Sequence, residues 1–433
     1  MNKKVSAMDY KQAWTYLDNL QFFKIKLRLS EMTDFLVRVD SPHYGLNFIH
    51  VGGTNGKGSV GATLLTLLSR AGYKVGLYTS PHLSSVRERF RINDFFITQE
   101  DFAEIASSIR GCLGDGRMTY FEFTTALALL WFAREKADLV IMEVGLGGRL
   151  DATNIINPLV SVITNVSLDH EVHLGSTVAE IAGEKAGIIK PGVPVISGVV
   201  DEGREVISAV CKERGADLYL LGRDFYGIKK SDTTWDYTGW SGRYYKDLFT
   251  RLKGGYQRDN AALSLAVLER LAGLGFEVEE PLVREGLSRV VWPGRLEYFR
   301  SGGYYYLLDG AHNPAGIAGL REALDLNFNY DKLICVWTSM SDKDVSKTLL
   351  KFIDRCDKII FTRPEKERSA LTEDLRQVLS VDDRRKALCL DEVPDALAAA
   401  RRLASDQDLI CIAGSLYLVG YARRLLLGDV VDW

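Results

Sequence analysis

The chain contains 433 residues, of which 54 are Lys or Arg and 57 are Asp or Glu, so its formal net charge is −3. At roughly 150 residues per domain, this length predicts two or three domains with at least one large core, which excludes a small disulfide scaffold or an isolated binding module. The charges of both signs are spread along the chain, which excludes a strongly basic nucleic-acid-binding protein and an acidic disordered tail, so no nucleic-acid partner is expected.

The first half of the chain predicts a sheet whose strands alternate with helices. Short apolar runs indicate buried strands, and longer runs with helical periodicity lie between them. Strands are expected at residues 46–51, 74–78, 138–144 and 159–165, and helices at residues 59–71 and 123–135. Such alternation is typical of a mostly parallel sheet covered by helices on both faces.

A different pattern occupies residues 231–252, which are rich in Trp, Tyr, Thr and Gly and alternate in character. We expect a small antiparallel patch there, followed by a helix over residues 260–272. Pro and Gly then interrupt the chain in the stretch WPGRLEYF, residues 292–299. A domain boundary is predicted at this point, which gives domains 1–295 and 296–433.

The second predicted domain contains five apolar runs, each of which precedes an expected helix. These strands are expected at residues 304–308, 332–337, 358–361, 387–390 and 409–413. Five such units fit a compact doubly wound α/β domain. No GxGxxG motif follows any of them, so a dinucleotide site is not expected in this half of the chain.

Six cysteines occur without a CxxC pair, which favours reduced, buried thiols over a disulfide framework or a zinc ribbon. The first residues contain no apolar run long enough for a signal peptide, and no stretch reaches the roughly 18 apolar residues of a membrane span. A cytoplasmic protein without a membrane partner is therefore expected.

The stretch GGTNGKGS, residues 52–59, lies between a predicted strand and a predicted helix. Glycines allow successive backbone N–H groups to point at phosphate oxygens, and a helix N-terminus adds positive potential. In this context Lys57 would reach the terminal phosphates of a nucleotide, and Ser59 would begin the helix near a Mg²⁺ ion. The spacing departs from the general Walker pattern, so a glycine-rich turn with a chance lysine is the alternative.

An acid and a histidine follow the next two buried strands. Glu143 stands near the end of the strand at 138–144 and precedes the stretch GLGGRLDATN. Because ligands collect at the carboxyl ends of strands in a doubly wound sheet, Glu143 is well placed for a phosphate-bound Mg²⁺, and capping of the next segment is the alternative. His170 has either a metal role or an ordinary hydrogen-bonding role. The stretch HEVH, residues 170–173, lacks the histidine spacing of a zinc hydrolase, so a zinc site is not favoured.

Lys185 lies in the apolar, small-residue stretch IAGEKAGI, residues 181–188. A buried lysine loses proton affinity, so its neutral amine could react with CO₂ to give a carbamate anion. The alternative is a salt bridge to Glu184 or to another acid. From the residues alone, the salt bridge is favoured.

Taken together, these motifs resemble those of folylpolyglutamate synthases, whose bacterial members are often also dihydrofolate synthases, within the ATP-dependent amide ligases that include the Mur peptidoglycan ligases. The resemblance covers nearly the whole chain, and the phosphate-loop spacing is this family's version of the loop. The matching motifs are GTNGKGS (53–59), TSPHL (79–83), ERFRIN (88–93), FEFTT (121–125), VGLGGRLDATN (144–154), LDH (168–170), EKAGI (184–188), WPGRLE (292–297), DGAHNP (309–314) and GSLYLVG (414–420).

The resemblance implies a role for each matching position. The implied ATP-binding residues are Asn55, Gly56, Lys57, Gly58, Ser59, Asn260, Arg295 and Asp309. The implied ligands of two Mg²⁺ ions are Ser80, Glu143 and His170, and the implied catalytic residues are Lys57, Glu143, His170 and a carbamoylated Lys185. The implied folate (pterin) site comprises Thr119, Tyr120, Phe121, Glu122, Leu150, Asp151 and Ala152, and the implied glutamate site comprises Arg89, His312 and Ser415.

The resemblance also implies a fold and a reaction. The fold is a P-loop ATPase-like, doubly wound and mostly parallel sheet with a small antiparallel patch, plus a C-terminal Rossmann-like α/β domain. Domain 1–295 would bind ATP and folate, domain 296–433 would bind glutamate, and the protein would be a monomer. The reaction would join L-glutamate to a tetrahydrofolate or folylpolyglutamate through an acyl phosphate, with dihydropteroate as a further acceptor. The alternatives are a Mur-type ligase on a cell-wall precursor and a P-loop nucleotide-dependent switch protein.

Overall fold

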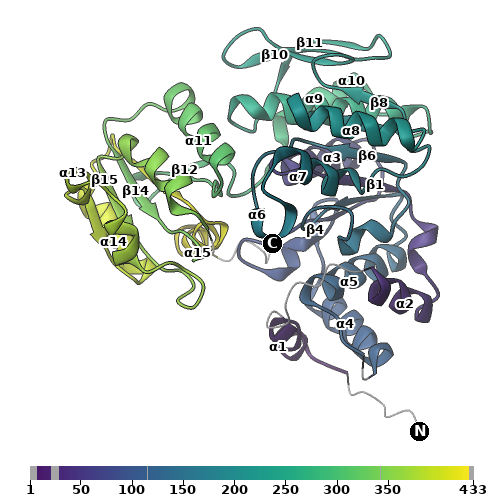
Figure 1. The fold of residues 1–433 in the computed structure, drawn as a ribbon, viewed down its shortest axis with the longest axis horizontal. Coiled ribbons are helices and arrows are strands. Elements are labelled where there is room, and N and C mark those ends of the chain that lie inside the picture. The colour runs from purple at the N-terminus through teal and green to yellow at the C-terminus, as the bar shows by residue number, and fades with distance from the viewer. Residues whose placement is uncertain (1–6, 21–28, 115, 342, 429–433) are drawn as a thin grey trace. The chain divides into compact units, whose positions relative to one another are not determined.

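The computed structural model describes residues 7–20, 29–114, 116–341 and 343–428, which form two compact units (Figure 1). The first unit comprises Met1–Ser80, Arg87–Arg251 and Arg258–Val290. The second unit comprises Pro81–Val86, Leu252–Gln257 and Val291–Trp433. The chain therefore contributes two short early segments to the second unit before its main part begins.

An eight-stranded sheet forms the centre of the first unit, in the order β4-β3-β2-β5-β1-β6-β7-β8. Its strands are β1 (Phe48–Gly52), β2 (Val75–Tyr78), β3 (Phe90–Ile92), β4 (Phe95–Phe96), β5 (Leu139–Glu143), β6 (Val160–Ile163), β7 (Val195–Ser197) and β8 (Leu218–Leu220). Six neighbouring strands pair in parallel, in the order β2-β5-β1-β6-β7-β8. Strands β3 and β4 extend the sheet beyond β2 in antiparallel pairing. Strands β1, β2, β5 and β6 are buried along their whole length, as expected for a sheet covered on both faces.

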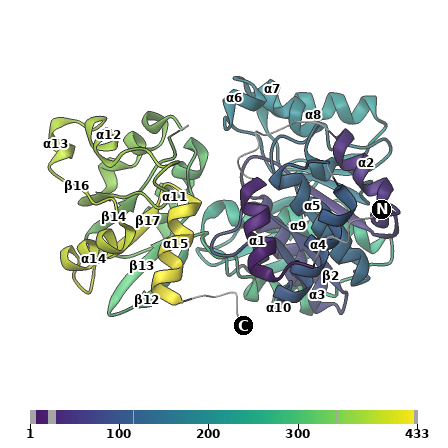
Figure 2. The ribbon, with the colours of Figure 1, turned by 90° about the horizontal axis from the view of Figure 1, so that it is seen from below.

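Helices of the first unit pack against this sheet and against one another. They are α1 (Tyr10–Asn19), α2 (Ser30–Arg38), α3 (Lys57–Arg70), α4 (Gln99–Leu113), α5 (Tyr120–Arg134), α6 (Glu171–Leu174), α7 (Val178–Ala186), α8 (Asp201–Glu213), α9 (Gly255–Ala272) and α10 (Glu280–Arg289). Helices α1, α4 and α5 lie side by side (Figure 2), and α7 packs on α8. Helix α5 is apolar almost all round, which explains why most of its residues are buried.

The antiparallel patch expected at residues 231–252 is confirmed, and it is larger than expected. Three strands form it in the order β11-β10-β9: β9 (Tyr226–Lys229), β10 (Thr234–Thr238) and β11 (Tyr244–Phe249). In β11, Tyr245 and Leu248 are buried while Tyr244 and Phe249 are exposed, which is typical of an antiparallel sheet with one solvated face. The middle strand β10 is buried at three consecutive residues, Trp235, Asp236 and Tyr237.

A six-stranded sheet forms the second unit, in the order β12-β13-β17-β14-β15-β16. Its strands are β12 (Glu297–Ser301), β13 (Tyr304–Leu308), β14 (Leu333–Trp337), β15 (Lys358–Phe361), β16 (Ala387–Cys389) and β17 (Leu409–Ala413). The five predicted strands pair in parallel, and β12 adds an unpredicted antiparallel edge to β13. The α/β fold class expected for both halves of the chain is thereby confirmed.

One expectation about the second unit is wrong, because β14 is not followed by an α-helix. The α-helices of this unit are α11 (Pro314–Asn327), α12 (Thr372–Gln377), α13 (Val381–Arg384), α14 (Val393–Leu403) and α15 (Leu416–Leu427). After β14 the chain makes three 3₁₀ turns, η5 (Val345–Lys347), η6 (Leu349–Lys351) and η7 (Ile353–Arg355). Asp344 and Thr348 bond to the local backbone there, which competes with helix formation.

The early segment Pro81–Val86 packs tightly within the second unit. A Cβ atom added at Gly420 of α15 would lie 2.0 Å from the Leu83 carbonyl oxygen, so only glycine fits there. The Ser84 hydroxyl donates a hydrogen bond to the Gly420 carbonyl at 3.3 Å. The Leu83 side chain also approaches Gly294, which precedes β12.

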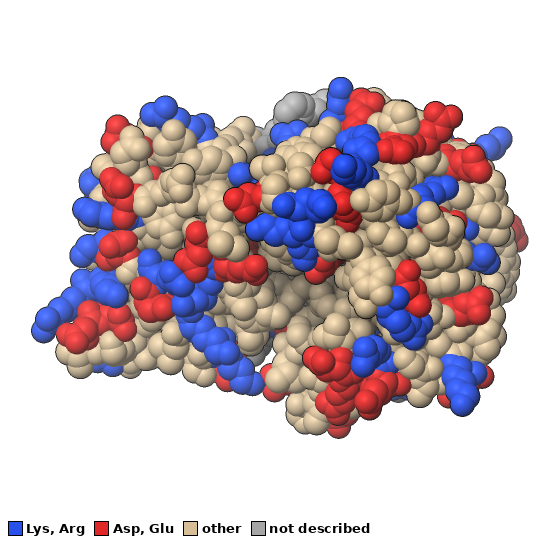
Figure 3. All heavy atoms as spheres, turned by 90° about the horizontal axis from the view of Figure 1, so that it is seen from above, with Lys and Arg blue, Asp and Glu red and all other residues tan. Residues whose placement is uncertain are grey.

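The surface carries charges of both signs. On the face shown in Figure 3, Lys and Arg side chains are interspersed with Asp and Glu side chains. Within the described part of the chain, every helix is too short or too polar to cross a membrane.

Candidate nucleotide and substrate site

The phosphate loop lies between β1 and α3, and its backbone is shaped by glycine. Gly53 and Gly56 have φ values of +137° and +87°, which lie in the region that favours glycine. Helix α3 begins at Lys57, two residues earlier than expected, so Ser59 lies buried in the first turn instead of starting the helix. Gly56 is the N-cap residue, and no side chain caps α3, so the N–H groups of its first turn face the loop. Such a helix start is suited to an anion.

The loop is held in place by the residues that follow β6, which the sequence analysis did not identify. The Asn55 N–H donates to Asn165 Oδ1 at 2.9 Å. The Asn55 carbonyl accepts from Thr164 Oγ1 at 2.6 Å and from Asn165 Nδ2 at 3.0 Å. On the helix side, a Cβ at Gly56 would lie 2.5 Å from Asn260 Oδ1, so the predicted residue Asn260 of α9 packs directly on the loop.

Lys57 folds back over the same loop. Its ammonium donates to the carbonyls of Gly53 and Thr54, both at 3.1 Å. The positive charge therefore lies over the backbone that the glycines shape, where the phosphates of a nucleotide are expected.

The predicted Mg²⁺ ligands lie at the carboxyl edge of the central strands. Glu143 is the last residue of β5, is 6% exposed and pairs in register with Val51 of β1, which leads into the phosphate loop. Ser80 follows β2, the other neighbour of β5. His170 follows β6, adopts φ +51°, and its Nε2 lies 3.9 Å from Asp169 Oδ1.

The donor set at this edge suits Mg²⁺ better than zinc. Within the described ranges, no three His, Cys, Asp or Glu side chains come together in a way that could hold a metal ion. A structural zinc site needs four such ligands and a catalytic zinc site needs three. Mg²⁺ instead takes one or two carboxylates together with phosphate and water oxygens, so Glu143 and the hydroxyls of Ser59 and Ser80 fit it.

Lys185 lies in the last turn of α7 and is 3% exposed. Burial lowers its pKa to about 7, and the nearby Lys57 ammonium adds to this effect, while Asp169 and Asp151 oppose it. The predicted salt bridge to Glu184 does not form, because Glu184 pairs with Arg149 at 2.8 Å. Of the carboxylates that the structure describes, none makes an ion pair with Lys185. The amine is therefore available in its neutral form near neutral pH.

Gly187 lets α7 approach the GLGG loop closely, and it was not singled out from the sequence. A Cβ at Gly187 would lie 2.3 Å from the Cα of Arg149, whose backbone cannot easily move. We predict that Gly187→Ala lowers the free energy of unfolding by about 1–3 kcal/mol through overpacking.

Gly183→Ala is the matched control on the same helix, because nothing lies within 4 Å of its added Cβ. It should raise the free energy of unfolding by about 0.5–1 kcal/mol through helix propensity. Urea unfolding of both variants measures the difference. Equal stabilities would contradict the close approach at Gly187.

Asp151 organises the GLGG loop from within. Its carboxylate accepts hydrogen bonds from the N–H groups of Gly145, Leu146 and Thr153 at 2.8–3.0 Å, and burial raises its pKa. It is flanked by half-buried Leu150 and buried Ala152. Asp151 thus shapes the backbone of the predicted folate region, because its oxygens are occupied by the chain itself.

The structure brings the two predicted folate segments together. The aromatic ring of Phe121, near the start of α5, packs on Gly145 so closely that an added Cβ would lie 2.4 Å from it. Thr119 caps α5, and Glu122 Oε2 accepts from its N–H at 2.7 Å and its hydroxyl at 2.9 Å. Among the described residues, the buried Glu122 Oε1 has no hydrogen-bond partner. The guanidinium of Arg89 lies 5.1 Å from the centre of the Tyr120 ring, so this predicted glutamate contact lies beside the folate segment.

The remaining predicted residues belong to the second unit. His312 follows β13 and Ser415 follows β17, the neighbouring strand, so both lie at one edge of the six-stranded sheet. His312 Nδ1 donates to the Gly310 carbonyl at 2.8 Å, and Ser415 caps α15. Asp309 accepts from the N–H groups of Leu296 and Ala311 at 2.8 and 2.9 Å. Burial raises its pKa, and the nearby Arg295 guanidinium opposes that rise.

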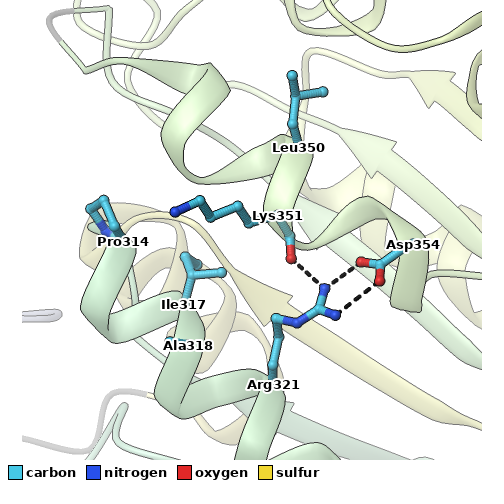
Figure 4. Close-up of a pocket in the computed structure, with 7 residues that line it drawn as sticks. All are labelled: Pro314, Ile317, Ala318, Arg321, Leu350, Lys351 and Asp354. Carbon is cyan, nitrogen blue, oxygen red and sulfur yellow. Dashed lines mark hydrogen bonds and ion pairs between the residues drawn. The ribbon is translucent and has the colours of Figure 1, made fainter.

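A cavity of about 450 Å³ also opens in the second unit between α11 and the 3₁₀ turns (Figure 4). Its lining residues are Pro314, Ile317, Ala318, Arg321, Leu350, Lys351 and Asp354. None of them is a predicted site residue. The side chain of Arg321 is engaged by Asp354 and by the Lys351 carbonyl.

Comparison with known proteins agrees with this arrangement. Residues 51–268 match the Mur ligase middle domain, and residues 294–416 match the Mur ligase glutamate ligase domain. A dihydrofolate synthase/folylpolyglutamate synthase of Bacillus subtilis is 32% identical over 439 residues, which cover 96% of this chain and 99% of that protein.

Solved structures show the same similarity. Folylpolyglutamate synthase of Mycobacterium tuberculosis, complexed with ADP and AMPPCP, is 30% identical, with a TM-score of 0.89 and coverage of 96% of this chain and 99% of that one. FolC of E. coli, in complex with DHPP and ADP, is 32% identical, with a TM-score of 0.88 and coverage of 97% and 98%. The resemblance seen in the motifs is confirmed: the chain belongs to the folylpolyglutamate synthase/dihydrofolate synthase family of the ATP-dependent Mur ligases.

Proposed function

We propose that this chain uses ATP to join L-glutamate to a tetrahydrofolate or folylpolyglutamate, as a tetrahydrofolate synthase, and that it also joins L-glutamate to dihydropteroate. The observation that carries the proposal is the cluster at the carboxyl edge of the eight-stranded sheet, where the phosphate loop, Glu143 and the buried Lys185 occur together. The nucleotide complexes of the M. tuberculosis and E. coli relatives, and the DHPP complex of the latter, support ATP and a small-molecule acceptor as substrates.

The phosphate loop would bind the nucleotide. The uncapped N–H groups at the start of α3 would contact phosphate oxygens, and Lys57 would neutralise the terminal phosphate as it moves to the acceptor carboxylate. Asn260 supports the loop from α9. Arg295 and Asp309 would complete the nucleotide site from the second unit.

Glu143, Ser80 and His170 would hold the two proposed Mg²⁺ ions. When bound, Mg²⁺ would offset the negative charge of two anions that must approach each other, the acceptor carboxylate and the phosphates. Glu143 is suited to this role because it is a buried acid beside the strand that leads into the phosphate loop.

Lys185 would act as a carbamate. In this step the lone pair of the neutral amine attacks the carbon of CO₂, a C–N bond forms, and the amine loses one proton to water. The carbamate carries a negative charge near the Lys57 ammonium. This ammonium repels the protonated form of Lys185, whereas it attracts the carbamate. The low exposure of Lys185 and the assignment of Glu184 to Arg149 support this proposal.

The acceptor would lie between the start of α5 and the GLGG loop, with Thr119, Tyr120, Phe121 and Glu122 on one side and Leu150, Asp151 and Ala152 on the other. The unpartnered Glu122 Oε1 is an acceptor suited to the N–H groups of a pterin ring.

Glutamate would be placed by His312 and Ser415, with Arg89 contributing from the first domain. Residues 1–295 would otherwise bind ATP and folate, and residues 296–433 would bind glutamate. The acceptor carboxylate attacks the terminal phosphorus of ATP, which gives an acyl phosphate and releases ADP. The neutral amino group of glutamate then attacks the acyl carbon, a C–N bond forms, phosphate leaves, and the nitrogen releases a proton to water. We propose that the protein acts as a cytoplasmic monomer.

The decisive experiment assays the purified protein with ATP, Mg²⁺ and L-glutamate, and with dihydropteroate or tetrahydrofolate added separately. We expect ADP formation that depends on both the acceptor and glutamate, together with a product heavier by one glutamyl residue in mass spectrometry. ATP consumption that ignores both acceptors would contradict the proposed function.

A further inference from the structure

The segment Gly294–Leu296 of the second unit has an unusual backbone. Gly294 has φ +70°, and Leu296 has φ +46° although it is not glycine. A left-handed conformation costs roughly 1–2 kcal/mol at a non-glycine residue, so surrounding contacts must impose it. Arg295 lies between these two residues and therefore depends on the same contacts for its direction.

One set of contacts comes from the loop after β13. The Leu296 N–H donates to Asp309 Oδ2 at 2.8 Å, and the Gly310 N–H donates to the Gly294 carbonyl at 2.9 Å. The Arg295 side chain packs on Gly310, where an added Cβ would lie 2.7 Å from Nη1. Asp309 and Gly310 therefore hold the two peptide groups that flank Arg295.

A second set of contacts comes from a partly buried ion pair. Arg423 Nε of α15 donates to Glu297 Oε1 at 2.9 Å and to Oε2 at 3.0 Å. Glu297 Oε2 also accepts from the Gly294 N–H at 2.8 Å. The side chains of Arg423 and Glu297 are only 9% and 20% exposed. The same carboxylate thus binds a guanidinium and fixes the peptide group that enters the segment.

We propose that Glu297 and Arg423 are a positioning pair, which fixes the peptide before Gly294 and, together with Asp309 and Gly310, sets the direction of the Arg295 side chain. Arg423 holds the Glu297 carboxylate in place, so that Oε2 stays on the Gly294 N–H. Without this anchor, the Gly294 carbonyl and the Leu296 N–H keep their partners in the loop after β13, but the Gly294 N–H loses its acceptor. The proposal rests on the assignment of Arg295 to nucleotide binding under the proposed function.

The location of the pair supports a role beyond stability. Replacing a buried ion pair by apolar residues is often neutral for stability, whereas a pair that also binds a strained backbone segment selects one conformation of that segment. The neighbouring Gly294 is itself tightly enclosed, since an added Cβ would lie 3.0 Å from Val419 and 3.1 Å from Leu83.

The test measures ADP affinity of the full-length protein by calorimetry in the presence of Mg²⁺. Arg423→Met is expected to weaken ADP binding about tenfold, as is Arg295→Ala, which corresponds to about 1.4 kcal/mol. In the double variant Arg295→Ala/Arg423→Met, the Arg423 substitution should add little further loss, because it acts through Arg295. Additive losses would overturn the proposal, as would wild-type affinity in Arg423→Met.

Arg423→Lys carries the same test if Arg423→Met does not fold, because lysine keeps the charge but lacks the Nε geometry that contacts both carboxylate oxygens. It should bind ADP more weakly than the wild type, and this loss should nearly disappear when Arg295 is also replaced by alanine. Asp354→Asn is the control, because it breaks the Arg321–Asp354 ion pair at the cavity in the same unit (Figure 4) and should leave ADP affinity unchanged.

Failure of the proposed function gives a different result. If the wild-type protein does not bind ADP, or if Arg295→Ala binds it normally, the nucleotide assignment is wrong and the positioning role falls with it. If Arg295→Ala binds ADP weakly while Arg423→Met and Arg423→Lys bind it normally, only the positioning role is wrong.

Discussion

Replacing Lys57 by alanine is expected to lower the rate of acceptor- and glutamate-dependent ADP formation by about 10³-fold. The Lys57 ammonium lies over the phosphate loop, held by the Gly53 and Thr54 carbonyls. Lys185 cannot replace this charge, because its pKa of about 7 leaves much of its amine uncharged. Steady-state kinetics with saturating ATP measure kcat, and circular dichroism verifies that the variant is folded.

Lys74→Ala is the matched control for this result. Lys74 precedes β2, is partly exposed and pairs with Glu135 at 2.9 Å. An ion pair of this kind contributes at most about 1 kcal/mol, so the variant should keep full activity. Substantial turnover by Lys57→Ala would show that phosphate neutralisation depends on other groups and would contradict the role assigned to the loop.

Lys185→Ala is expected to lose about 10²–10³-fold in kcat, and added short carboxylic acids such as acetate should restore part of the activity. The reason is that the substitution leaves space for a carboxylate in place of the proposed carbamate. The measurement is kcat as a function of acetate concentration at constant ionic strength. Full activity of Lys185→Ala without additives would eliminate the carbamate proposal.

Two further measurements separate a carbamate from a merely structural lysine. Acetate should not rescue Lys57→Ala, because that variant lacks a cation. In CO₂-free buffer, the unfolded chain holds a proton on Lys185 between about pH 7 and its ordinary pKa of 10.5, whereas the folded chain has released it. The stability of the wild type relative to Lys185→Met should therefore rise with pH across this window and level off below about pH 7. A difference independent of pH would contradict the lowered pKa.

The central strands and the phosphate loop could be predicted because their signals are local. The apolar runs that became β1, β5 and β6 are continuous because both faces of the sheet are covered, and the glycines around Lys57 mark the loop directly. Short edge strands such as β4 and β12 carry no such run, because their residues alternate or are exposed. The 3₁₀ turns after β14 were missed because local hydrogen bonds of Asp344 and Thr348 outweighed an otherwise plausible helical pattern.

The chemistry of Lys185 shows where local sequence misleads. Its neighbour Glu184 made a salt bridge the favoured interpretation, but consecutive helical residues point in different directions. The partner of Glu184 is Arg149, 35 positions earlier in the chain. Only the fold brings them together, and only the fold shows that Lys185 is buried beside Lys57. Likewise, Thr164 and Asn165 bind Asn55 of the phosphate loop, which lies 109 and 110 positions earlier in the chain. No local motif predicts this contact.

Because the chain passes more than once between the two units, the second unit cannot be produced whole from one continuous fragment. A fragment that starts at Val291 would lack Pro81–Val86, and with it the backbone of Leu83 that covers Gly420 and the side chain that covers Gly294. Such a fragment would leave Gly420 of α15 and Gly294 without the chain segment that packs against them. During synthesis, the segment that contains Leu83 leaves the ribosome more than 300 residues before Gly420, so the second unit cannot complete its packing until Gly420 has also been made. Separating the ligase into independently expressed halves therefore requires a circular permutation or a grafted loop, not a single break.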